Sequence, residues 1–350
     1  ERMTASGVLL GWLISLAAVA TIVATPFVPK LMSWFKPRTI IFAFLIIGAA
    51  TNPAFKMFMT PSAWFVIKFV SSCVFTVVFV VCEIWINQVA PEHMRGRLFG
   101  MYGAALAGGM GIGSGLAVLT GIDGWMPFLV CGGLNLLAVL PFLLFRRAQP
   151  ITPTSKDNAK FSKIFKIMMA APAIMMCAVV FGAIEQTMIY FLPVYDTRLG
   201  HTEHAARILL FIAAVGNALF QLPMGMLADK VNRNRLTIFL MSIAFIGPVL
   251  MAGVGANFAR LAVLAFFYIG LTTALYTVGL VQLGERFKGP DLSAANAGFI
   301  VAYGIGSLII PPIAGKLMDI FNPYGFMWTM AGLGLAGLIV VTIRRVRFIR

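Results

Sequence analysis

Three ionisable side chains stand inside long apolar stretches of this sequence, namely Lys68, Glu83 and Glu185. In a membrane helix such a group costs at least about 2.5–3.5 kcal/mol, so its position points to binding, proton transfer or a structural ion pair. Glu185 has the most suggestive neighbours, because Gln186 and Tyr190 follow closely and can orient a ligand. A carboxylate balanced between desolvation and a nearby cation can load and release a proton near neutral pH. We therefore predict proton or substrate binding at Glu185, with a structural pair as the alternative.

The composition predicts that these groups lie in a lipid bilayer. The chain has 350 residues, of which 60% are hydrophobic and 11% are charged, whereas soluble domains carry about 25% charged residues. Apolar runs of about 20 residues recur along the whole chain, and each is long enough to cross a ~30 Å hydrocarbon core. The alternating pattern of a transmembrane barrel is not seen. We predict an all-α, multi-pass integral membrane protein. Its eleven predicted spans are approximately 5–27, 38–57, 62–89, 98–120, 124–145, 165–195, 204–227, 236–255, 259–284, 292–315 and 323–343.

The distribution of basic residues predicts the orientation of these spans. Of the 27 Lys and Arg residues, 20 fall on one side, six fall on the other, and Lys68 lies within a span. Cytoplasmic loops are enriched in Lys and Arg, so the first side is predicted to be cytoplasmic. The net charge of +15 has the same explanation, and we do not predict nucleic-acid binding. The four cysteines form no CxxC motif or Cys/His cluster, so no disulfide, metal or cofactor is expected.

The depths of the three ionisable groups suggest different roles. Lys68 lies ~9 Å and Glu185 ~15 Å from the outer ends of their helices, at 1.5 Å per residue. We hypothesise that these two groups approach each other and that their pairing alternates with protonation, although Lys68 can instead snorkel outward. Glu83 lies ~22 Å further along the helix than Lys68 and cannot pair with it there. A cytoplasmic gate salt bridge of Glu83 with Arg95 or Arg97 is favoured over substrate contact.

A weak internal repeat divides the chain. A shift of 197 residues places Pro223 on Pro26 and Arg235 on Arg38. We predict two like-oriented bundles, 1–145 and 164–350, joined by a cytoplasmic linker at 146–163, which is the parallel repeat of large transporters. Five spans precede the linker and six follow it, so we expect the first helix of the N-terminal half to be missing from this chain.

A cluster of charges interrupts the apolar pattern between two predicted spans. The segment GMLADKVNRNR (225–235) resembles the G-x-x-x-D-[RK]-x-G-[RK]-x-[RK] signature of the major facilitator superfamily. The residues that match the signature are Gly225, Asp229, Lys230, Arg233 and Arg235. Asn232 replaces the usual glycine, and asparagine tolerates the same left-handed backbone. The resemblance implies that Asp229 sits at a helix end near cationic partners and latches a cytoplasmic gate; the alternative is a solvated loop.

Three further segments, 68–102, 181–195 and 283–319, resemble the YcaD-like branch of this superfamily. The resemblance implies the major facilitator fold, with eleven of its usual twelve helices present. Some positions depart from the family pattern. Lys68 replaces the usual arginine of the fourth helix, Ser72 replaces a glycine, and Met32 stands where the first-half loop would carry its aspartate. The glycine-rich segment 103–115 is similar to the antiporter motif but lacks its proline, which makes it only a weak argument for efflux.

Lone polar residues in apolar spans are further candidates for the substrate or proton pathway, although such residues more often hold helices together. They are Asn217, Gln221, Tyr276 and Gln282, with Asn296 and Tyr303 as weaker candidates. His93, His201 and His204 lie in loops and are assigned no role.

These features together predict secondary transport of a small solute by alternating access, coupled to protons through Glu185 with Lys68. Efflux of an amphipathic or drug-like compound is favoured, and a monomer in the bacterial inner membrane is expected. There is no P-loop, so ATP-driven pumping is unsupported, and no convergent cluster suggests a membrane enzyme. A uniporter, or a receptor or scaffold on a transporter fold, remains the alternative.

Overall fold

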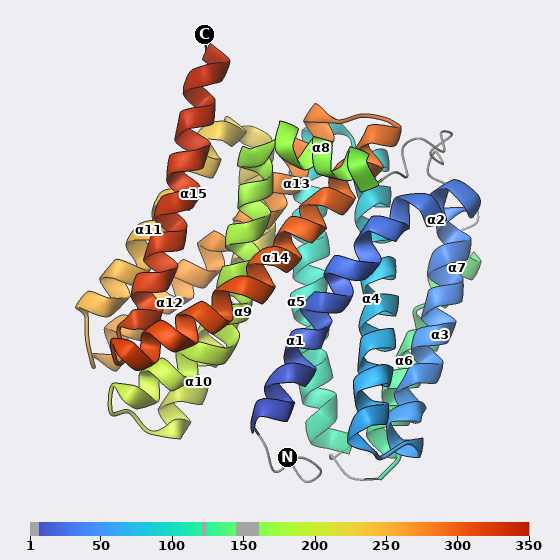
Figure 1. Cartoon of the computed structure of the whole chain (residues 1–350), viewed down its shortest axis with the longest axis horizontal. Coiled ribbons are helices and arrows are strands. Elements are labelled where there is room, and N and C mark those ends of the chain that lie inside the picture. Colours follow the sequence, from blue (N-terminus) through green and yellow to red (C-terminus); the bar gives the residue numbers. More distant parts are fainter. Residues whose placement is uncertain (1–6, 121–123, 145–160, 350) are drawn as a thin grey trace. The chain divides into compact units, whose positions relative to one another are not determined.

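The computed structural model describes residues 7–120, 124–144 and 161–349, and these residues form helices joined by short connections (Figure 1). Two short 3-10 turns, η1 (Thr25–Phe27) and η2 (Glu92–Met94), accompany the α-helices. The α-helices are α1 (Gly7–Ala24), α2 (Val28–Trp34), α3 (Pro37–Met57), α4 (Pro61–Val89), α5 (Arg95–Thr120), α6 (Met126–Leu137), α7 (Leu140–Leu144), α8 (Phe161–Ala170), α9 (Pro172–Arg198), α10 (Glu203–Lys230), α11 (Arg233–Gly253), α12 (Phe258–Thr272), α13 (Ala274–Arg286), α14 (Pro290–Ile320) and α15 (Gly325–Ile349).

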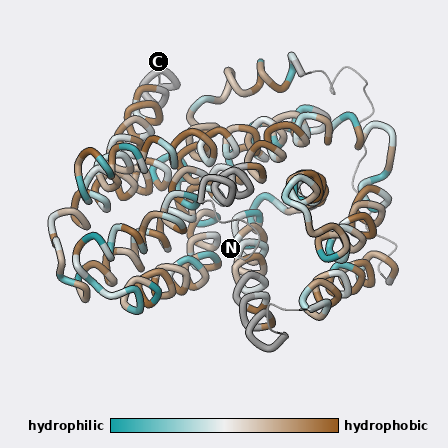
Figure 2. Tube along the Cα trace, turned by 60° about the horizontal axis from the view of Figure 1, so that its bottom comes forward, coloured by the Kyte–Doolittle hydropathy of each residue, from teal (hydrophilic) through white to brown (hydrophobic). Residues whose placement is uncertain are grey.

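The prediction of an all-α membrane protein is confirmed. Within the described residues, ten helical segments are long and apolar enough to cross a membrane, and each overlaps a predicted span; the first, Leu16–Trp34, lies further along the chain than the predicted 5–27. The helix α5 occupies the remaining predicted position. Hydrophobic residues dominate the lengths of the helices, and hydrophilic residues gather toward turns and helix ends (Figure 2).

Two predicted spans are interrupted in the structure. The prediction of one helix over 165–195 was wrong, because Ala171 leaves the helical conformation (φ −126°, ψ 52°) between α8 and α9. Pro172 explains this break, since a proline disfavours helical backbone at the residue before it. The span predicted at 259–284 is divided by Thr273 into α12 and α13, but Thr273 keeps helical angles (φ −56°, ψ −32°) and the apolar segment Phe258–Arg286 remains one candidate span. Of the predicted linker, 146–160 lies outside the described residues and 161–163 begins α8.

The described helices form two compact units, and each unit contains a segment from the opposite half of the sequence. The first unit comprises 1–89, 109–167 and 287–301, and the second comprises 90–108, 168–286 and 302–350. The start of α5 therefore packs with helices of the second half of the chain, and the start of α14 packs with helices of the first half. The division at 1–145, 146–163 and 164–350 stays a prediction based on the repeat.

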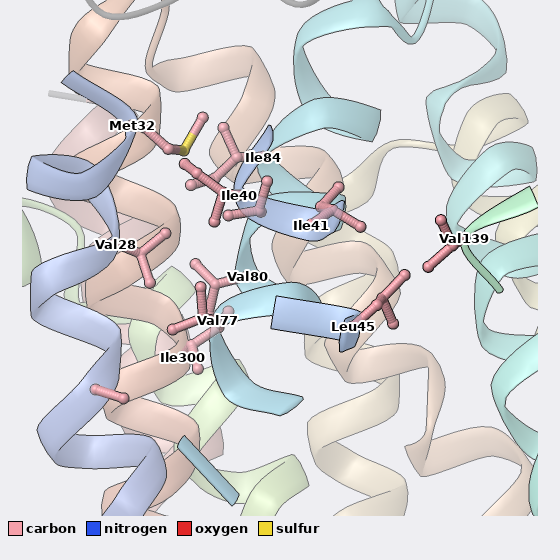
Figure 3. Close-up of a cluster of buried hydrophobic side chains, with 12 residues drawn as sticks. Val28, Met32, Ile40, Ile41, Leu45, Val77, Val80, Ile84, Val139 and Ile300 are labelled. Atoms are coloured by element: carbon pink, nitrogen blue, oxygen red, sulfur yellow. The ribbon is translucent and has the colours of Figure 1, made fainter. Parts of the chain in front are cut away.

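The core of the first unit is an apolar cluster contributed mainly by α2, α3, α4 and α14, with Ala24 at the end of α1 and Val139 between α6 and α7. Met32 and Val28 of α2 are fully buried in it, together with Ile84 of α4 and Ile300 of α14 (Figure 3). Asn87 of α4 also donates a 3.0 Å hydrogen bond to the Oδ1 atom of Asn296 in α14. The first half of α14 is thus held in this unit by both apolar and polar contacts.

The second unit is built around α9, which contacts α10, α13 and α15. Glycines allow some of its helices to approach at backbone distance. A Cβ atom on Gly182 of α9 would lie 2.8 Å from the Ser307 hydroxyl of α14, and one on Gly306 would lie 2.9 Å from the Val179 carbonyl carbon. Small residues at such crossings are a common basis of helix packing in membranes. This crossing fixes how α9 and α14 face each other.

Candidate functional site

Glu185 and Tyr303 face each other at the crossing of α9 and α14. The Tyr303 hydroxyl donates a hydrogen bond to the Glu185 Oε2 atom at 2.6 Å, which is within the range of a hydroxyl bound to a carboxylate. Gln186 follows Glu185 on α9 and is partly exposed. Glu185 is partly exposed rather than enclosed.

Three aromatic rings gather beside this pair. Phe181 stands one helical turn before Glu185 and packs on Tyr276 of α13, with ring centroids 5.1 Å apart. The Tyr303 ring lies 5.9 Å from Phe181 and 6.0 Å from Tyr276. The site therefore combines one carboxylate with a cluster of aromatic faces from α9, α13 and α14.

The two ionisable groups that the sequence paired lie in different units. Glu185 belongs to the second unit and forms no ion pair with any described side chain. Lys68 belongs to the first unit, is partly exposed, and likewise has no ion-pair partner among the described residues. The approach of Lys68 to Glu185 stays a prediction.

The other pathway candidates mostly bond to one another. Asn217 accepts a 3.0 Å hydrogen bond from Gln221 and a 3.1 Å hydrogen bond from Thr273, all through its Oδ1 atom. Gln282 donates to the Thr237 hydroxyl at 2.8 Å and so joins α13 to α11. Tyr190 is 41% exposed and lies outside the ring cluster. These contacts resemble helix-to-helix packing more than an open ligand site. At the crossing of α9 and α14 the structure brings together Glu185, Gln186 and Tyr276 of the predicted pathway, with Tyr303 from the weaker candidates.

The Asp229 carboxylate binds backbone N–H groups at the start of α5. Its Oδ1 atom accepts the Gly96 backbone N–H at 2.6 Å, and its Oδ2 atom accepts that of Arg97 at 2.8 Å. The first N–H groups of a helix have no partner within the helix and carry its positive dipole end, so a carboxylate is favoured there. Asp229, near the end of α10, therefore caps α5 from across the unit. The partner is backbone, whereas the sequence suggested cationic side chains.

Glycines make this cap possible. A Cβ atom on Gly225 would lie 2.9 Å from the Gly100 Cα atom, and one on Gly96 would lie 2.7 Å from the Asp229 Oδ1 atom. A Cβ atom on Gly103 would likewise fall on the Gln221 side chain. The α5 and α10 backbones meet too closely for side chains at these positions. We name this contact of Gly96, Gly100, Gly225 and Asp229 the α5–α10 latch.

The rest of the charged loop has local roles. Arg233 forms an ion pair with Glu285 of α13, and Lys230 and Arg235 are exposed. The expectation of a left-handed backbone at Asn232 was wrong, because its φ is −64° and its ψ is 112°. Its side chain instead accepts the Arg235 N–H at 3.1 Å and caps α11, which is a common use of asparagine before a helix.

Glu83 and its predicted salt-bridge partners, Arg95 and Arg97, belong to different units. Glu83 is fully buried in the first unit, and Arg95 is 4% exposed in the second. The Arg95 Nη2 atom donates to the Ala90 carbonyl oxygen at 3.4 Å, while Arg97 is exposed. A salt bridge from Glu83 to Arg95 or Arg97 stays a prediction.

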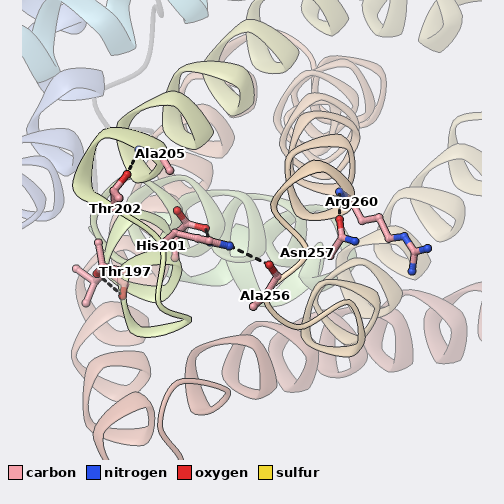
Figure 4. Close-up of polar contacts among 9 residues, drawn as sticks. Thr197, His201, Thr202, Ala205, Ala256, Asn257 and Arg260 are labelled. Carbon is pink, nitrogen blue, oxygen red and sulfur yellow. Dashed lines mark hydrogen bonds and ion pairs between the residues drawn. The ribbon is translucent and has the colours of Figure 1, made fainter.

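One contact was missed by sequence reasoning. His201 lies between α9 and α10, with its Nδ1 atom 2.6 Å from the Oδ1 atom of Asp196 and its Nε2 atom 2.9 Å from the Ala256 carbonyl oxygen (Figure 4). Both partners are acceptors, so the imidazolium form satisfies both contacts. The hydrogen bond with fully buried Asp196 raises the pKa of His201. A histidine five residues after an aspartate at a helix end was the available signal.

A multi-pass helical bundle with an ionisable residue inside an apolar helix is an architecture that membrane transport proteins use. The family model described as Major Facilitator Superfamily matches residues 2–215 and 196–348. The chain belongs to this superfamily of secondary transporters, which are not enzymes.

Named relatives and solved structures agree with this membership. The chain is 26% identical to the MFS-type transporter YfkF of Bacillus subtilis over 319 residues, covering 87% of this chain and 78% of YfkF. It is 25% identical to the MFS-type transporter YcaD of Escherichia coli over 262 residues, covering 74% of this chain and 66% of YcaD. The function of both relatives is uncharacterised.

The structural neighbours share the fold at low sequence identity. The Escherichia coli fucose:proton symporter FucP has a TM-score of 0.81 at 15% identity, covering 97% of this chain and 91% of FucP. The proton:xylose symporter XylE has a TM-score of 0.74 at 16% identity, and the match covers 95% of this chain and 85% of XylE. The human organic anion transporter MFSD10 has a TM-score of 0.76 at 13% identity, and the match covers 95% of this chain and 83% of MFSD10. At these identities the similarity establishes the fold alone.

Proposed function

We propose that this chain couples the movement of a small solute to protons and that Glu185 takes up and releases the coupled proton. The observation that carries the proposal is the Tyr303 hydroxyl bound to the Glu185 Oε2 atom at 2.6 Å. A tyrosine hydroxyl can donate to a carboxylate, where the bond is stronger, and also to the carbonyl oxygen of a protonated carboxyl group. An arginine in its place would hold the carboxylate ionised. Glu185 therefore has a partner that serves both of its charge states.

Two comparisons support proton coupling indirectly. FucP and XylE, which have the same fold, are proton symporters. The bacterial relatives YfkF and YcaD support a place in a bacterial plasma membrane. We further propose that the chain acts as a monomer. We also propose that it exports an amphipathic solute, because the rings of Phe181, Tyr276 and Tyr303 gather beside Glu185.

The α5–α10 latch fits a gate for alternating access. It joins a segment of the first half of the chain, 90–108, to a helix of the second half, on the predicted cytoplasmic side. Opening that side would separate the Asp229 carboxylate from two backbone N–H groups that water can then satisfy. We propose that the latch is made in the state closed to the cytoplasm and broken in the state open to it.

The direct test is proton flux in liposomes that carry the full-length protein and a trapped pH dye. A panel of small solutes is added, and wild type is compared with Glu185→Gln and with Glu185→Asp as the conservative control. Solute-triggered proton flux that disappears in Glu185→Gln and survives at a reduced rate in Glu185→Asp would support the proposal.

Other outcomes have distinct meanings. Flux that persists in Glu185→Gln would remove Glu185 as the proton carrier and leave the transporter intact. Solute movement without proton flux would favour a uniporter. Solute binding without movement of either species would favour a receptor or scaffold.

A further inference from the structure

We propose that His201 and Asp196 form a proton-dependent bridge between two turns of the second unit, on the predicted outer side. The bridge consists of the Asp196 carboxylate of α9, the His201 ring in the α9–α10 turn and the Ala256 carbonyl group in the α11–α12 turn, and we name it the His201 bridge. It is closed when the imidazole is protonated and open when the imidazole is neutral. The inference goes beyond the proposed function, because Asp196 lies 11 residues, or ~16 Å, from Glu185 along α9.

The end of α9 fixes the position of His201. Gly200 has a φ of 98°, in the left-handed region that favours glycine. Its N–H donates to the Thr197 carbonyl oxygen at 3.0 Å, and the His201 N–H donates to the Asp196 carbonyl oxygen at 3.3 Å. These two bonds form a Schellman motif, in which the positions of His201 and Asp196 often hold an apolar pair. Here the motif instead brings an imidazole to a carboxylate, with Nδ1 2.6 Å from Oδ1.

The second ring nitrogen reaches a turn that lies 55 residues later in the chain. The His201 Nε2 atom is 2.9 Å from the Ala256 carbonyl oxygen (Figure 4). The Phe258 ring at the start of α12 packs edge-on against the imidazole, with ring centroids 5.6 Å apart. One side chain therefore contacts both turns, and its polar contacts depend on how many protons it carries.

The burial of Asp196 determines which contact opens. Asp196 is fully buried, and within the described part of the chain its Oδ2 atom has no hydrogen-bond partner. A buried carboxylate without a donor is costly, so Asp196 keeps the Nδ1–H of His201 in both states of the ring. A neutral imidazole then has no proton on Nε2, and its lone pair faces the Ala256 carbonyl oxygen. Two acceptors repel at this distance, so the α11–α12 turn is released.

The other ionisable groups on the surrounding elements are paired or exposed. They are Arg198, which pairs with Asp319 of α14; Glu203 and Arg207 of α10, which pair with each other; and His204 of α10 and Arg260 of α12, which are exposed. Two tyrosine rings, Tyr195 and Tyr324, pack together at the end of α9. Asp196 is therefore the charged group that acts on His201.

The sign of the pH dependence follows from these contacts. The hydrogen bond with Asp196 raises the pKa of His201 above its usual value of about 6.5. The imidazole side chain is 18% exposed, so protons of the surrounding solution can reach it. The bridge is therefore closed at acidic pH and opens as the pH rises through the folded pKa. It makes the outer ends of α9 to α12 respond to pH without Glu185.

Two measurements on the full-length protein in lipid nanodiscs test the bridge. The first is a ¹³C-histidine NMR titration, in which the three histidines of the chain are assigned by single changes to glutamine. The second is electron paramagnetic resonance of a nitroxide on Ala256→Cys, with the four native cysteines replaced, from about pH 5 to about pH 9. We expect an immobile label at acidic pH and a mobile component whose midpoint equals that of the His201 titration. The labelled and unlabelled proteins must give the same titration.

Two variants of the bridge connect the mobility to its groups. His201→Gln should remove the pH dependence of the Ala256 label. Asp196→Asn keeps the shape and an acceptor oxygen but removes the charge, so the NMR and mobility midpoints should shift together to lower pH. A role of Asp196 in packing alone would not move either midpoint.

Three controls make the result specific. His204→Gln, the matched substitution at an exposed neighbour, should leave the transition at its wild-type midpoint. A nitroxide at the exposed Ser62 of α4 reports how pH affects a turn without the bridge. Glu185→Gln should keep the transition, so failure of the proposed proton carrier would not be confused with failure of the bridge.

The proposal is contradicted by either of two results. An Ala256 label whose mobility stays constant while His201 titrates would show that the Ala256 contact does not depend on the proton. A transition that survives in His201→Gln would assign the pH dependence to another group. Both results come from wild type and His201→Gln, so the test stands even if Asp196→Asn does not fold.

Discussion

The two halves of the sequence place opposite chemistry at one repeat position. Asp229, in the second half, accepts two backbone N–H groups at the start of α5. Met32, 197 residues earlier, is fully buried in the apolar cluster that also contains Ile300 of α14. Asp229 forms hydrogen bonds that water can replace when the contact opens. Met32 forms only apolar packing. The repeat therefore does not impose equal latches on the two units.

The largest expected effect comes from giving Met32 the chemistry of Asp229. Met32→Asp puts a carboxylate into an apolar cluster, and an unpaired buried charge costs several kcal/mol. We expect a strong loss of thermal stability in nanodiscs, whereas Met32→Leu, which conserves volume and polarity, should cost less than about 1.5 kcal/mol. A Met32→Asp protein as stable as Met32→Leu would mean that this position does not depend on apolar packing, and the contrast between the units would fail.

A side chain at the centre of the α5–α10 latch should have the next largest effect. Gly225→Ala places a Cβ atom 2.9 Å from the Gly100 Cα atom, and neither backbone can yield easily. Overpacking of this kind costs about 1–3 kcal/mol. The matched control is Gly109→Ala in α5, where no atom lies within 4 Å of the new Cβ. Thermal unfolding should distinguish the two variants. Equal stability would mean that α5 and α10 do not meet at Gly225.

Removal of the capping charge should have a smaller effect on stability and a clear effect on gating. Asp229→Ala loses both N–H contacts of α5, and loss of a helix cap costs about 0.5–2 kcal/mol. We expect greater labelling of a cysteine introduced at Arg97 by a membrane-impermeant thiol reagent applied from the cytoplasmic side, in a background without the native cysteines. Met32→Ala is the comparison variant. If Met32→Ala increases labelling and Asp229→Ala does not, the polar contact is not the one that closes this side.

The smallest predicted effect depends on pH. The pKa of His201 is raised by its hydrogen bond with Asp196, so its stabilisation is fully present below about pH 6.5, the unfolded value. It is lost as the pH rises through the folded pKa. His201→Gln should therefore lower the melting temperature more at acidic than at alkaline pH. The same change at the exposed neighbour His204 is the matched control for a histidine-to-glutamine substitution in this loop. The same difference at every pH would show that His201 acts only by packing.

Much of the fold could be predicted from the sequence, because apolar runs, turn residues and basic loops have simple physical causes. The division at Thr273 could not, since the apolar pattern continues through it, whereas Pro172 was an available signal for the break at Ala171. The sequence also did not predict that each unit contains a segment from the other half of the chain. No sequence pattern indicates that residues 90–108 pack with helices of the second half and not with the helices that precede them.

The candidate site was predicted only in part. Glu185, Gln186 and Tyr276 stood out as polar residues in apolar helices, and Asp229 was correctly expected at a helix end. Tyr303 was ranked low, because its contact with Glu185 spans 118 residues and depends on the close crossing allowed by Gly182 and Gly306. The partner of Asp229 is backbone, which carries no signature in sequence.

The most direct test of the central claim is infrared difference spectroscopy of the full-length protein in lipid, recorded across a pH titration. If Glu185 carries the proton, wild type will show a carboxylic-acid carbonyl band that appears and disappears with pH. This band will be absent in Glu185→Gln and shifted in Tyr303→Phe, which removes only the hydroxyl bound to the Oε2 atom. An identical titrating band in Glu185→Gln would contradict the account.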